Sequence, residues 1–566
     1  MSTDPGVPAP SSALVVDGSG LVVAVTAAGH ESYDLREARA RTVLAERSAS
    51  TRWVTWSARD LAAVLSLGVA LPRVWDLAEA HRLIHGGWRA DPATVWAAVH
   101  DLDPAAIPAP PGDDLFAVLD SSADEPEVLV RPDGYLRADA GPGWVVGVDR
   151  AVAWGRAALE AAARQQAALE RVGPRAVMTT HAESAAAVLA VELERDGLPV
   201  DREELERLVT EAAGARPATE QDEMRARAER DAPVLATVPG IGRVDLRNPA
   251  SVKGLLATAG VDVPSTRKWV LMEHVDRHPL VPALLEWRRR ERIATTYGWR
   301  WLATHVGADD RLRGAWSACD GAAGRMTAQA GLHNLPAELR PGVAAAPGHV
   351  LVRADLGQVE PRVLAVVSQD RSFAAATAAD DLYSPVAERL GVERSVAKIA
   401  VLAAMYGQRS GAAGEALRGL ERAYPVAMRH LDAAQREGEG GRPVRTYGGR
   451  RVRTDLGEVG DADATQVEGL RRARGRFARN AVIQGSAAEL FKAWAVTVRA
   501  AVRPLGGQVV LCLHDELLVH VPEAHGQRCA ELVDEALTLS ARRWAGHDGV
   551  RFVSDTSIVR RWSEAK

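Results

Sequence analysis

Residues 509–522, VVLCLHDELLVHVP, decide how the rest of the chain is interpreted. An apolar run leads to His514, Asp515 and Glu516, and a second apolar run follows to the end of the stretch. Two short β-rich runs on either side of a tight polar turn predict a β-hairpin. The turn contains neither Gly nor Asn, so turn chemistry alone does not explain it. Two adjacent carboxylates on a rigid hairpin could bind a divalent cation, and a surface hairpin with solvated acids is the alternative.

The length and composition of the chain are those of a multidomain globular protein. At 566 residues it is too long for one core, and about three or four domains are expected. The three cysteines, Cys319, Cys512 and Cys529, have no metal spacing, so neither a disulfide framework nor a zinc site is supported. No apolar run approaches the roughly 18 residues of a membrane span. No membrane association and a cytoplasmic location are therefore expected.

The charged residues are distributed unevenly. Residues 1–180 hold 16 basic and 23 acidic side chains, whereas the rest of the chain holds 53 basic and 51 acidic ones. If nucleic acid is bound, the C-terminal two thirds is the expected place. Only five of the 69 basic residues are lysines, so the position of each lysine is informative.

Changes of pattern divide the chain into four parts. Residues 1–12 are small, polar and rich in proline, and are expected to form a disordered tail. Strand-like alternation followed by a helical pattern over residues 148–172 predicts a small α/β domain at 13–178. Residues 179–310 are mostly helical in pattern, and strands, glycine-rich turns and helices alternate through residues 311–566.

A second carboxylate is expected at the end of a buried strand. Residues 350–362 read VLVRADLGQVEPR, in which Asp355 follows the strand pattern of residues 351–354. One such carboxylate is weak evidence for a metal site. Paired with Asp515, it could clamp two Mg²⁺ ions roughly 3.5–4 Å apart, the arrangement used for phosphoryl or nucleotidyl transfer.

A polar stripe is predicted on one helix in residues 394–407, RSVAKIAVLAAMYG. Arg394, Lys398, Leu402 and Tyr406 recur every four residues and lie along one helix face. A stripe of this kind is usually part of a core, but two of its members are cationic. The compact ammonium of Lys398 could contact a phosphate or donate a proton.

A basic helix is predicted over residues 281–304, with four arginines between Arg288 and Arg292. Such a run is either a solvated helix face or a face that contacts phosphates. Composition alone does not separate the two.

In this order, the segments resemble the family A DNA polymerases, the DNA polymerase I type, over about residues 183–566. Residues 355–362 resemble the family's motif A, residues 394–407 its motif B, and residues 514–516 its motif C. Shorter similarities lie at residues 296–297, 324–325, 334–336, 446–451, 480–485 and 562–566.

The resemblance implies a multidomain α/β and α+β protein. A right-hand polymerase of palm, fingers and thumb would follow an RNase H-like α/β domain of the 3′→5′ exonuclease type. The thumb and connecting helices would occupy residues 179–310, and palm and fingers residues 311–566, with the fingers at about 370–450. The implied activity is DNA-templated DNA synthesis in repair or replication, with primer-template DNA and dNTPs as partners. A monomer associated with the nucleoid is expected.

The resemblance also implies roles for the charged motif residues. Asp355 and Asp515 would hold two Mg²⁺ ions, for which Mn²⁺ can substitute. Glu516 would be an accessory acid. Arg394 and Lys398 would meet the triphosphate, and Lys398 would also be the candidate acid for the leaving group.

The other implied contacts are to the nucleotide and the DNA. Glu360 would crowd a ribose 2′-hydroxyl and favour dNTP over NTP, and Tyr406 would lie beside the templating base. Gln358 and Leu402 would also contact the nucleotide. The implied DNA-binding residues are Arg288, Arg292, Arg325, Asn334, Arg450, Asn480, Gln484 and His514.

Some positions depart from the family pattern. Leu356 and Gly357 stand where motif A has Tyr and Ser, and Pro361 removes a backbone donor where a helix should begin. Leu402 replaces an aromatic residue and cannot stack on a base or sugar. Tyr383 replaces a His. The acids and the motif B cations are intact, so a working polymerase is expected.

The N-terminal domain lacks much of the exonuclease pattern. Two metals there would need about four carboxylates. The first strand should carry D-x-E, but Asp17 is followed by Gly and Ser. Asp60 and Asp76 match later positions, and no Tyr-x3-Asp occurs at residues 151–155. A vestigial domain is predicted, with no 5′-nuclease domain before it.

Three other functions are compatible with these residues. The departures in motifs A and B would also suit a catalytically silent DNA-binding scaffold. A single-subunit RNA polymerase relative would share the three motifs, but Glu360 argues against it. A polymerase with retained 3′→5′ exonuclease activity is the third.

Overall fold

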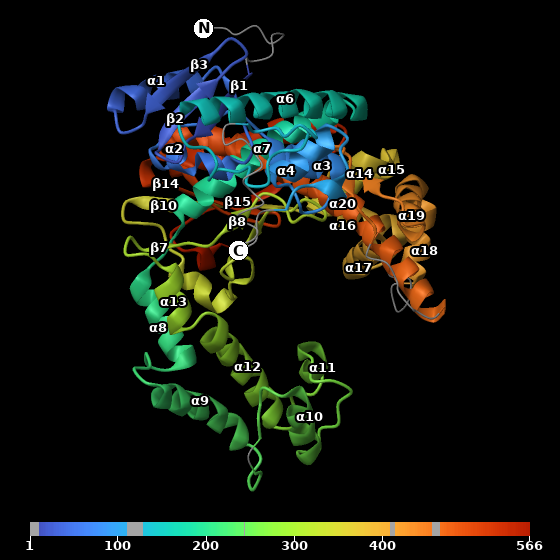
Figure 1. Ribbon diagram of the computed structural model, residues 1–566. Coiled ribbons are helices and arrows are strands. Elements are labelled where there is room, and N and C mark those ends of the chain that lie inside the picture. The colour runs from blue at the N-terminus through green and yellow to red at the C-terminus, as the bar shows by residue number, and fades with distance from the viewer. Residues whose placement is uncertain (1–10, 110–127, 243, 408–413, 456–463, 566) are drawn as a thin grey trace. The chain divides into compact units, whose positions relative to one another are not determined.

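The computed structural model describes residues 11–109, 128–242, 244–407, 414–455 and 464–565. The chain forms two units (Figure 1). Unit 1 contains Met1–Asp196, Trp316–Thr327 and Val352–Ile558, and unit 2 contains Gly197–Ala315, Ala328–Leu351 and Val559–Lys566. Most of the predicted tail lies outside the described residues, and Ser11 already begins the first strand.

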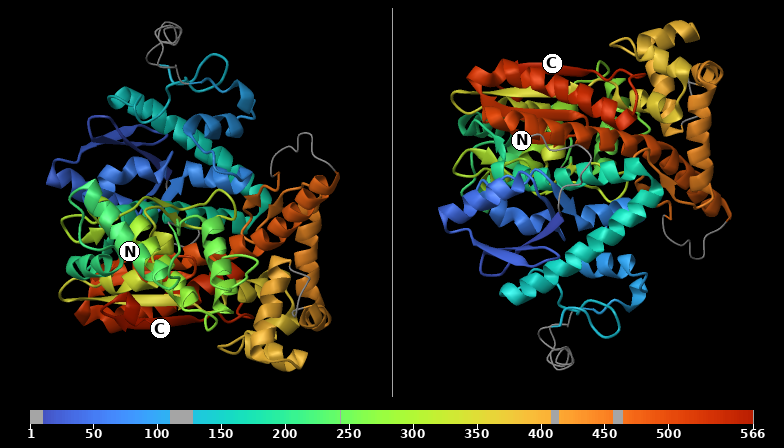
Figure 2. Two further views of the ribbon diagram at one scale, coloured as in Figure 1. Left: turned by 90° about the horizontal axis from the view of Figure 1, so that it is seen from below. Right: turned by 90° about the horizontal axis from the view of Figure 1, so that it is seen from above.

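A mixed five-stranded sheet forms the N-terminal part of unit 1. Its order is β3-β2-β1-β4-β5, with β1 parallel to β4, β4 parallel to β5 and the other pairs antiparallel. Helix α6 occupies Val148–Val172, as predicted, and packs on this sheet (Figure 2). The ring of Trp56, which directly follows β4, contacts the ring of Trp154 on α6, with the ring centroids 4.7 Å apart. The strands are β1 (Ser11–Val16), β2 (Leu21–Val25), β3 (His30–Asp34), β4 (Arg52–Thr55) and β5 (Val74–Asp76), and the smaller helices are α1 (Ala38–Ser48), α2 (Ala62–Ser66), α3 (Leu77–His85) and α4 (Pro92–Val99).

Two long helices of unit 1 share a buried ion pair. Helix α7 (Pro174–Asp196) packs on β5 and on α20 (Ala464–Val502). Lys492 of α20 forms an ion pair with Glu183 of α7, and both side chains are almost completely buried. Lys492 also donates hydrogen bonds to the carbonyls of Gly324 (2.6 Å) and Ala318 (3.2 Å). Paired and hydrogen-bonded in this way, the ammonium is tolerated in the interior.

The predicted hairpin at residues 509–522 is present in a second sheet of unit 1. Strands β13 (Gln508–Leu513) and β14 (Glu516–Pro522) are antiparallel, with Leu513 opposite Glu516. The sheet order is β13-β14-β10-β15, where β10 is His349–Leu356 and β15 is Ser554–Val559. Nearly every hairpin residue is buried, because α20 and α21 (Gly526–Ala545) pack beside these strands.

Six helices lie between β10 and α20 in the residues that the structure describes. The first, α14, starts at Val359, so Pro361 lies in the first turn. The N–H groups of a first turn have no acceptor within the helix, so proline is tolerated there despite its missing donor. These helices are α14 (Val359–Ser368), α15 (Arg371–Ala376), α16 (Tyr383–Leu390), α17 (Arg394–Tyr406), α18 (Gly414–Ala423) and α19 (Pro425–Glu439).

Unit 2 is mostly helical, and side chains from helices α9, α10, α11 and α12 contribute to its apolar core. The single helix predicted over residues 281–304 is wrong, because the structure has two helices with a break at Tyr297 and Gly298. At Gly298 a Cβ would clash with the Ala294 carbonyl oxygen, so a larger residue would require the backbone of this turn to shift. The helices are α8 (Arg202–Ala213), α9 (Glu220–Leu235), α10 (Pro249–Thr258), α11 (Lys268–Met272), α12 (Leu280–Thr296) and α13 (Trp299–His305).

The remaining strands are two-residue segments: β6 (Leu198–Pro199), β7 (Arg311–Leu312), β8 (Trp316–Ser317), β9 (Thr327–Ala328), β11 (Val444–Arg445) and β12 (Arg451–Val452). No helix among the described residues is both long and apolar enough to cross a bilayer.

Candidate active site

A cavity of about 220 Å³ in unit 1 brings together many of the predicted site residues. Its wall combines residues from β10, α14, α17, α20 and the β13–β14 turn, which are far apart in the sequence. Predicted site residues in the wall are Arg325, Gln358, Glu360, Lys398, Leu402, Gln484, His514 and Asp515.

The two predicted metal-binding acids lie at the ends of neighbouring strands. Asp355 is near the end of β10, and Asp515 is in the turn between β13 and β14. The Leu356 amide donates to the Asp515 carbonyl at 2.9 Å and joins the two segments. His514 in this turn has a φ of +50°, a left-handed conformation that costs free energy for a residue with a Cβ. The turn therefore holds Asp515 in place although the backbone conformation of His514 is strained.

The electrostatics of the two acids suit a cation. Burial, and after it the negative charge of Asp515, raises the pKa of Asp355 to about 6. Burial also raises the pKa of Asp515. A divalent cation would relieve this repulsion, and carboxylate oxygens are the ligands that Mg²⁺ prefers. No group of three or more His, Cys, Asp or Glu side chains that could hold a metal occurs in the described part of the chain.

Arg353 lies on the same strand as Asp355, two residues earlier and on the same face. Its Nη2 donates to Asp355 Oδ2 at 2.8 Å, and its Nε donates to Glu516 Oε1 at 2.9 Å. Its Nη1 reaches Asp555 Oδ2 at 3.3 Å. The accessory acid Glu516 is therefore an ion-pair partner of Arg353.

The predicted ribose-facing acid Glu360 belongs to a hydrogen-bond network. Arg325 Nη2 donates to Glu360 Oε1 at 3.1 Å. The hydroxyl of Tyr406 hydrogen-bonds Glu360 and Gln484. Burial raises the pKa of Glu360, and the charge of Arg325 opposes this rise. The network holds Glu360 at the cavity wall and joins the start of α14 and the end of α17 to the middle of α20.

The predicted stripe on α17 faces away from the core. Arg394, Lys398 and Tyr406 are exposed and Leu402 is half-buried, whereas the residues on the other face are buried. Lys398 and Leu402 reach the cavity. The branched side chain of Leu402 adds an apolar surface to this wall.

Arg394 is held by Asp381 at the start of α16. Its Nε and Nη2 donate to the two carboxylate oxygens at 2.7 and 3.0 Å. Gln358 Nε2 donates to the same carboxylate at 2.6 Å. The Arg394 guanidinium holds the pKa of Asp381 well below its usual range. Asp381 would compete with a phosphate for the Arg394 guanidinium.

The structure does not place Arg450 where DNA could reach it. This side chain is 2% exposed, and its Nη2 lies 2.6 Å from Glu183. Its Nη1 donates to the sulfur of Cys319 at 3.3 Å. The prediction of a DNA contact is therefore wrong for Arg450, which is a core residue paired with a carboxylate 267 positions earlier in the chain.

Asn480 and Asn334 lie outside the cavity wall. The Asn480 side-chain oxygen is buried without a hydrogen-bond partner among the described residues. Asn334 is exposed in unit 2, and its carbonyl accepts from Arg292 Nη2 and from the Tyr297 hydroxyl, both at 2.8 Å.

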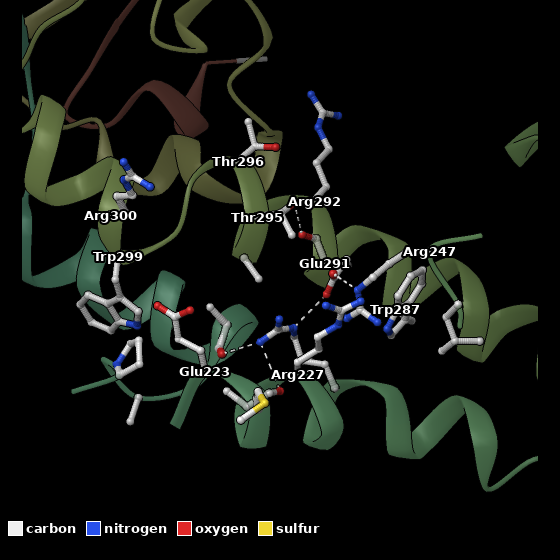
Figure 3. A pocket seen from close by; sticks show the side chains of 18 of the residues that line it. Glu223, Arg227, Arg247, Trp287, Glu291, Arg292, Thr295, Thr296, Trp299 and Arg300 are labelled. Carbon is white, nitrogen blue, oxygen red and sulfur yellow. Dashed lines mark hydrogen bonds and ion pairs between the residues drawn. The ribbon is translucent and has the colours of Figure 1, made fainter. Parts of the chain in front are cut away.

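The predicted thumb arginines line a larger cavity of about 1100 Å³ in unit 2 (Figure 3). Arg288 donates to the Thr266 carbonyl, and burial lowers its pKa. In the same wall Glu291 pairs with Arg247 (2.7 Å) and Arg230 (3.0 Å). Seven arginines and three glutamates line this cavity: Arg216, Arg227, Arg230, Arg247, Arg288, Arg292 and Arg300, with Glu220, Glu223 and Glu291.

Several residues of the smaller cavity were not predicted. Met326, Phe491 and the small residues Ala487 and Ala488 belong to its wall. Apolar side chains at helical spacing look like ordinary core residues, so no local signal distinguishes them. Arg353 could have been predicted, because strand alternation places its side chain on the same face of the strand as Asp355.

The acids proposed for the N-terminal domain serve as turn and helix caps. Asp17 Oδ1 accepts from the amides of Ser19 (2.9 Å) and Leu21 (2.8 Å). Asp76 accepts from the Glu79 amide at the start of α3. Asp60 completes a capping box. Each carboxylate is thus used in local structure.

The chain is similar in sequence to known DNA polymerases. A model of DNA polymerase family A matches residues 252–564. DNA polymerase I of Chloroflexus aurantiacus is 31% identical over 301 residues, which are 48% of this chain and 31% of that protein. DNA polymerase theta of Caenorhabditis elegans is 26% identical over 291 residues, 48% of this chain and 17% of that protein. The thermostable DNA polymerase I of Thermus filiformis is 27% identical over 318 residues, 51% of this chain and 37% of that protein.

A solved structure shares the fold over most of the chain. The POL domain of Pol1 from M. smegmatis, in complex with DNA primer-template and dNTP, has a TM-score of 0.68 and 20% identity, over 98% of this chain and 95% of that one. The fold is therefore that of a polymerase domain. The chain belongs to DNA polymerase family A. It spans less than two fifths of the length of the three curated relatives.

Proposed function

We propose that this protein is a DNA-templated DNA polymerase that adds dNTPs to a primer 3′-hydroxyl. The observation that carries the proposal is the junction of Asp355 and Asp515 beside a cavity whose wall also contains Lys398 and Glu360. Asp515 and Lys398 of the cavity wall, together with the adjoining Asp355, supply the two acids and the ammonium that nucleotidyl transfer requires.

The acids would hold the metal ions of this reaction. Mg²⁺ bound there, or Mn²⁺ in its place, would lower the pKa of the primer hydroxyl and neutralise charge on the phosphates. Asp355 and Asp515 orient these ions through strand ends that neighbouring strands hold in place. Lys398 makes no ion pair with any described residue, so its ammonium is available to a triphosphate and to the leaving pyrophosphate.

Glu360 would select the sugar. Arg325 and Tyr406 hold its carboxylate at the cavity wall. A 2′-hydroxyl placed against a fixed, buried carboxylate would be crowded and poorly solvated, whereas a deoxyribose would fit. This arrangement favours dNTP over NTP.

Unit 2 would contribute to DNA binding through its arginine-lined cavity. Arg216 and Arg300 donate no side-chain hydrogen bond and form no ion pair within the described residues, so both guanidinium groups can meet phosphates. Arg292 uses one nitrogen on the Asn334 carbonyl and retains others. Phosphate contacts of this kind supply affinity without sequence preference. The protein would act as a monomer on the DNA of the nucleoid.

The N-terminal domain would be vestigial as an exonuclease. The carboxylates of Asp17, Asp60 and Asp76 accept hydrogen bonds from backbone amides. The sequence at residues 151–155 contains no fourth acid. Two metals held by about four carboxylates could not be assembled from this set.

Primer extension with the wild-type protein, Mg²⁺ and the four dNTPs tests the proposed function. Templated extension is expected, and replacing dNTPs with NTPs should nearly abolish it. Glu360→Ala should restore part of the NTP use, with Glu388→Ala on α16 as a control outside the cavity. DNA binding without extension would contradict the proposal and favour a silent scaffold.

A further inference from the structure

Arg353 forms an ion pair with Asp355 of the proposed metal site, with Nη2 2.8 Å from Oδ2. It projects from β10, whose neighbours in the sheet are β14 on one side and β15 on the other. Its partners come from all three strands: Asp355 on β10, Glu516 on β14 and Asp555 on β15. The planar guanidinium carries five donors in a rigid fork and can therefore engage several carboxylates at once.

The three partners of Arg353 are unequal. Glu516 and Arg353 are both 11% exposed in their side chains, so their ion pair is shielded from water. Asp355 is 33% exposed and Asp555 is 70% exposed. Shielded pairs are weakened less by solvent than exposed ones. Glu516 is therefore the strongest anchor of Arg353, and the contact with Asp355 is easier to exchange.

We propose that Arg353 is an internal counter-cation that competes with the metal ion for Asp355, and that Glu516 retains Arg353 when the metal binds. This inference rests on the proposed function, in which Asp355 is a metal ligand. A metal ion held by Asp355 would share that carboxylate with the Nη2 of Arg353, which donates to Oδ2 at 2.8 Å, and two cations at one carboxylate repel each other. Metal binding would therefore push Arg353 away from Asp355 and toward Glu516 and Asp555.

This proposal assigns a role to Glu516. The acid does not need to bind the metal, because it positions the residue that competes with the metal. Removing its charge would leave Arg353 to rest on Asp355 and would lower metal affinity. Removing Arg353 would have the opposite effect, since the site would become more negative.

The test is Mn²⁺ binding to the full chain without DNA or nucleotide, measured from the electron paramagnetic resonance signal of free Mn²⁺. The double variant Arg353→Met/Glu516→Gln removes both members of the shielded pair and leaves no lone buried charge. Its Mn²⁺ affinity should rise about 10-fold, the low end of the effects of outer-shell groups. Glu516→Gln alone should lower the affinity several-fold. Asp555→Asn, at an exposed position, should lower it slightly without affecting folding.

Two controls separate this inference from the metal assignment on which it rests. Asp355→Asn should abolish the tightest Mn²⁺ binding, and unchanged binding there would overturn both the metal assignment and the inference. If Asp355→Asn loses binding but the double variant binds Mn²⁺ no more tightly than wild type, only the inference is overturned. Circular dichroism of each variant checks that the fold is retained.

Discussion

At the scale of single residues, the lysines show how the same group serves different purposes. Lys492 is 1% exposed and neutralises Glu183 in the core. Lys398 is exposed at the cavity wall and pairs with no described residue. An ammonium needs little space and rotates to suit its acceptors, so it fits both the narrow buried site and a flexible phosphate contact.

Lys492→Met should destabilise unit 1 by about 3 kcal/mol, because Glu183 loses a buried partner and two carbonyls lose a donor. Urea unfolding followed by tryptophan fluorescence measures this loss. Lys253→Met is the matched control, since Lys253 is exposed on α10. Equal stability of the two variants would show that the buried pair contributes nothing.

Metal affinity should depend on pH through Asp355. Its pKa is raised to about 6 in the folded protein, above the ordinary 3.8, so the carboxyl is protonated below pH 6 and ionised above it. Because metal and proton compete for the carboxylate, Mn²⁺ affinity should fall about tenfold for each pH unit below 6 and level off above 7. Titration of Mn²⁺ from pH 5 to 8 tests this dependence. A constant affinity over this range would contradict it.

At the scale of elements, strand ends and helix starts place the acids and cations. The β13–β14 turn accepts a left-handed His514 to present Asp515, and Gln358 is also left-handed, with φ +54°, immediately before α14. Both residues belong to the cavity wall. The two strained residues lie where elements meet at the site. Packing of the surrounding sheet and helices offsets the free energy that their conformations cost.

The pair between α16 and α17 should restrain nucleotide binding. Asp381→Asn would remove the charge that holds Arg394, so the KM for dNTP should fall about 2- to 5-fold, as expected for a partly exposed ion pair. Steady-state single-nucleotide incorporation measures this change. Arg394→Ala should raise KM, and an unchanged KM in Asp381→Asn would mean that the pair does not compete with the nucleotide.

The elements that are marked by a pattern of neighbouring residues could be predicted from the sequence. The hairpin, the strand before Asp355, the helix at residues 148–172 and the stripe on α17 all follow from alternation or helical spacing. The burial of Arg450 could not, because it depends on a contact made only after folding. Arg450 meets Glu183, and nothing near either residue in the sequence indicates the other.

At the scale of the whole molecule, one chain combines a polymerase-type site with an N-terminal α/β domain whose acids are structural. Asp76 shows the difference clearly. It accepts from the Ala58 amide at 2.7 Å and from the Glu79 amide at 2.9 Å, and it is 2% exposed. Its position suits the stability of the domain and leaves little access for a metal ion.

No 3′→5′ degradation of labelled single-stranded DNA is expected from the wild-type protein. Asp76→Ala should lower stability by about 1–2 kcal/mol, because it removes a helix N-cap, and should leave primer extension near the wild-type rate. Gel analysis of the labelled strand and thermal unfolding provide the two readouts. Degradation that Asp17→Ala or Asp76→Ala removes would show an active exonuclease instead.

The central claim is that Asp355 and Asp515 carry nucleotidyl transfer, and single-turnover incorporation of one dNTP tests it most directly. Asp355→Asn and Asp515→Asn should each slow incorporation by on the order of 10³-fold, a loss comparable with removing a main electrostatic contact of a transition state. Duplex binding, measured by fluorescence anisotropy, should stay within about twofold of wild type. Incorporation at a rate near wild type in either variant, with duplex binding intact, would contradict the claim.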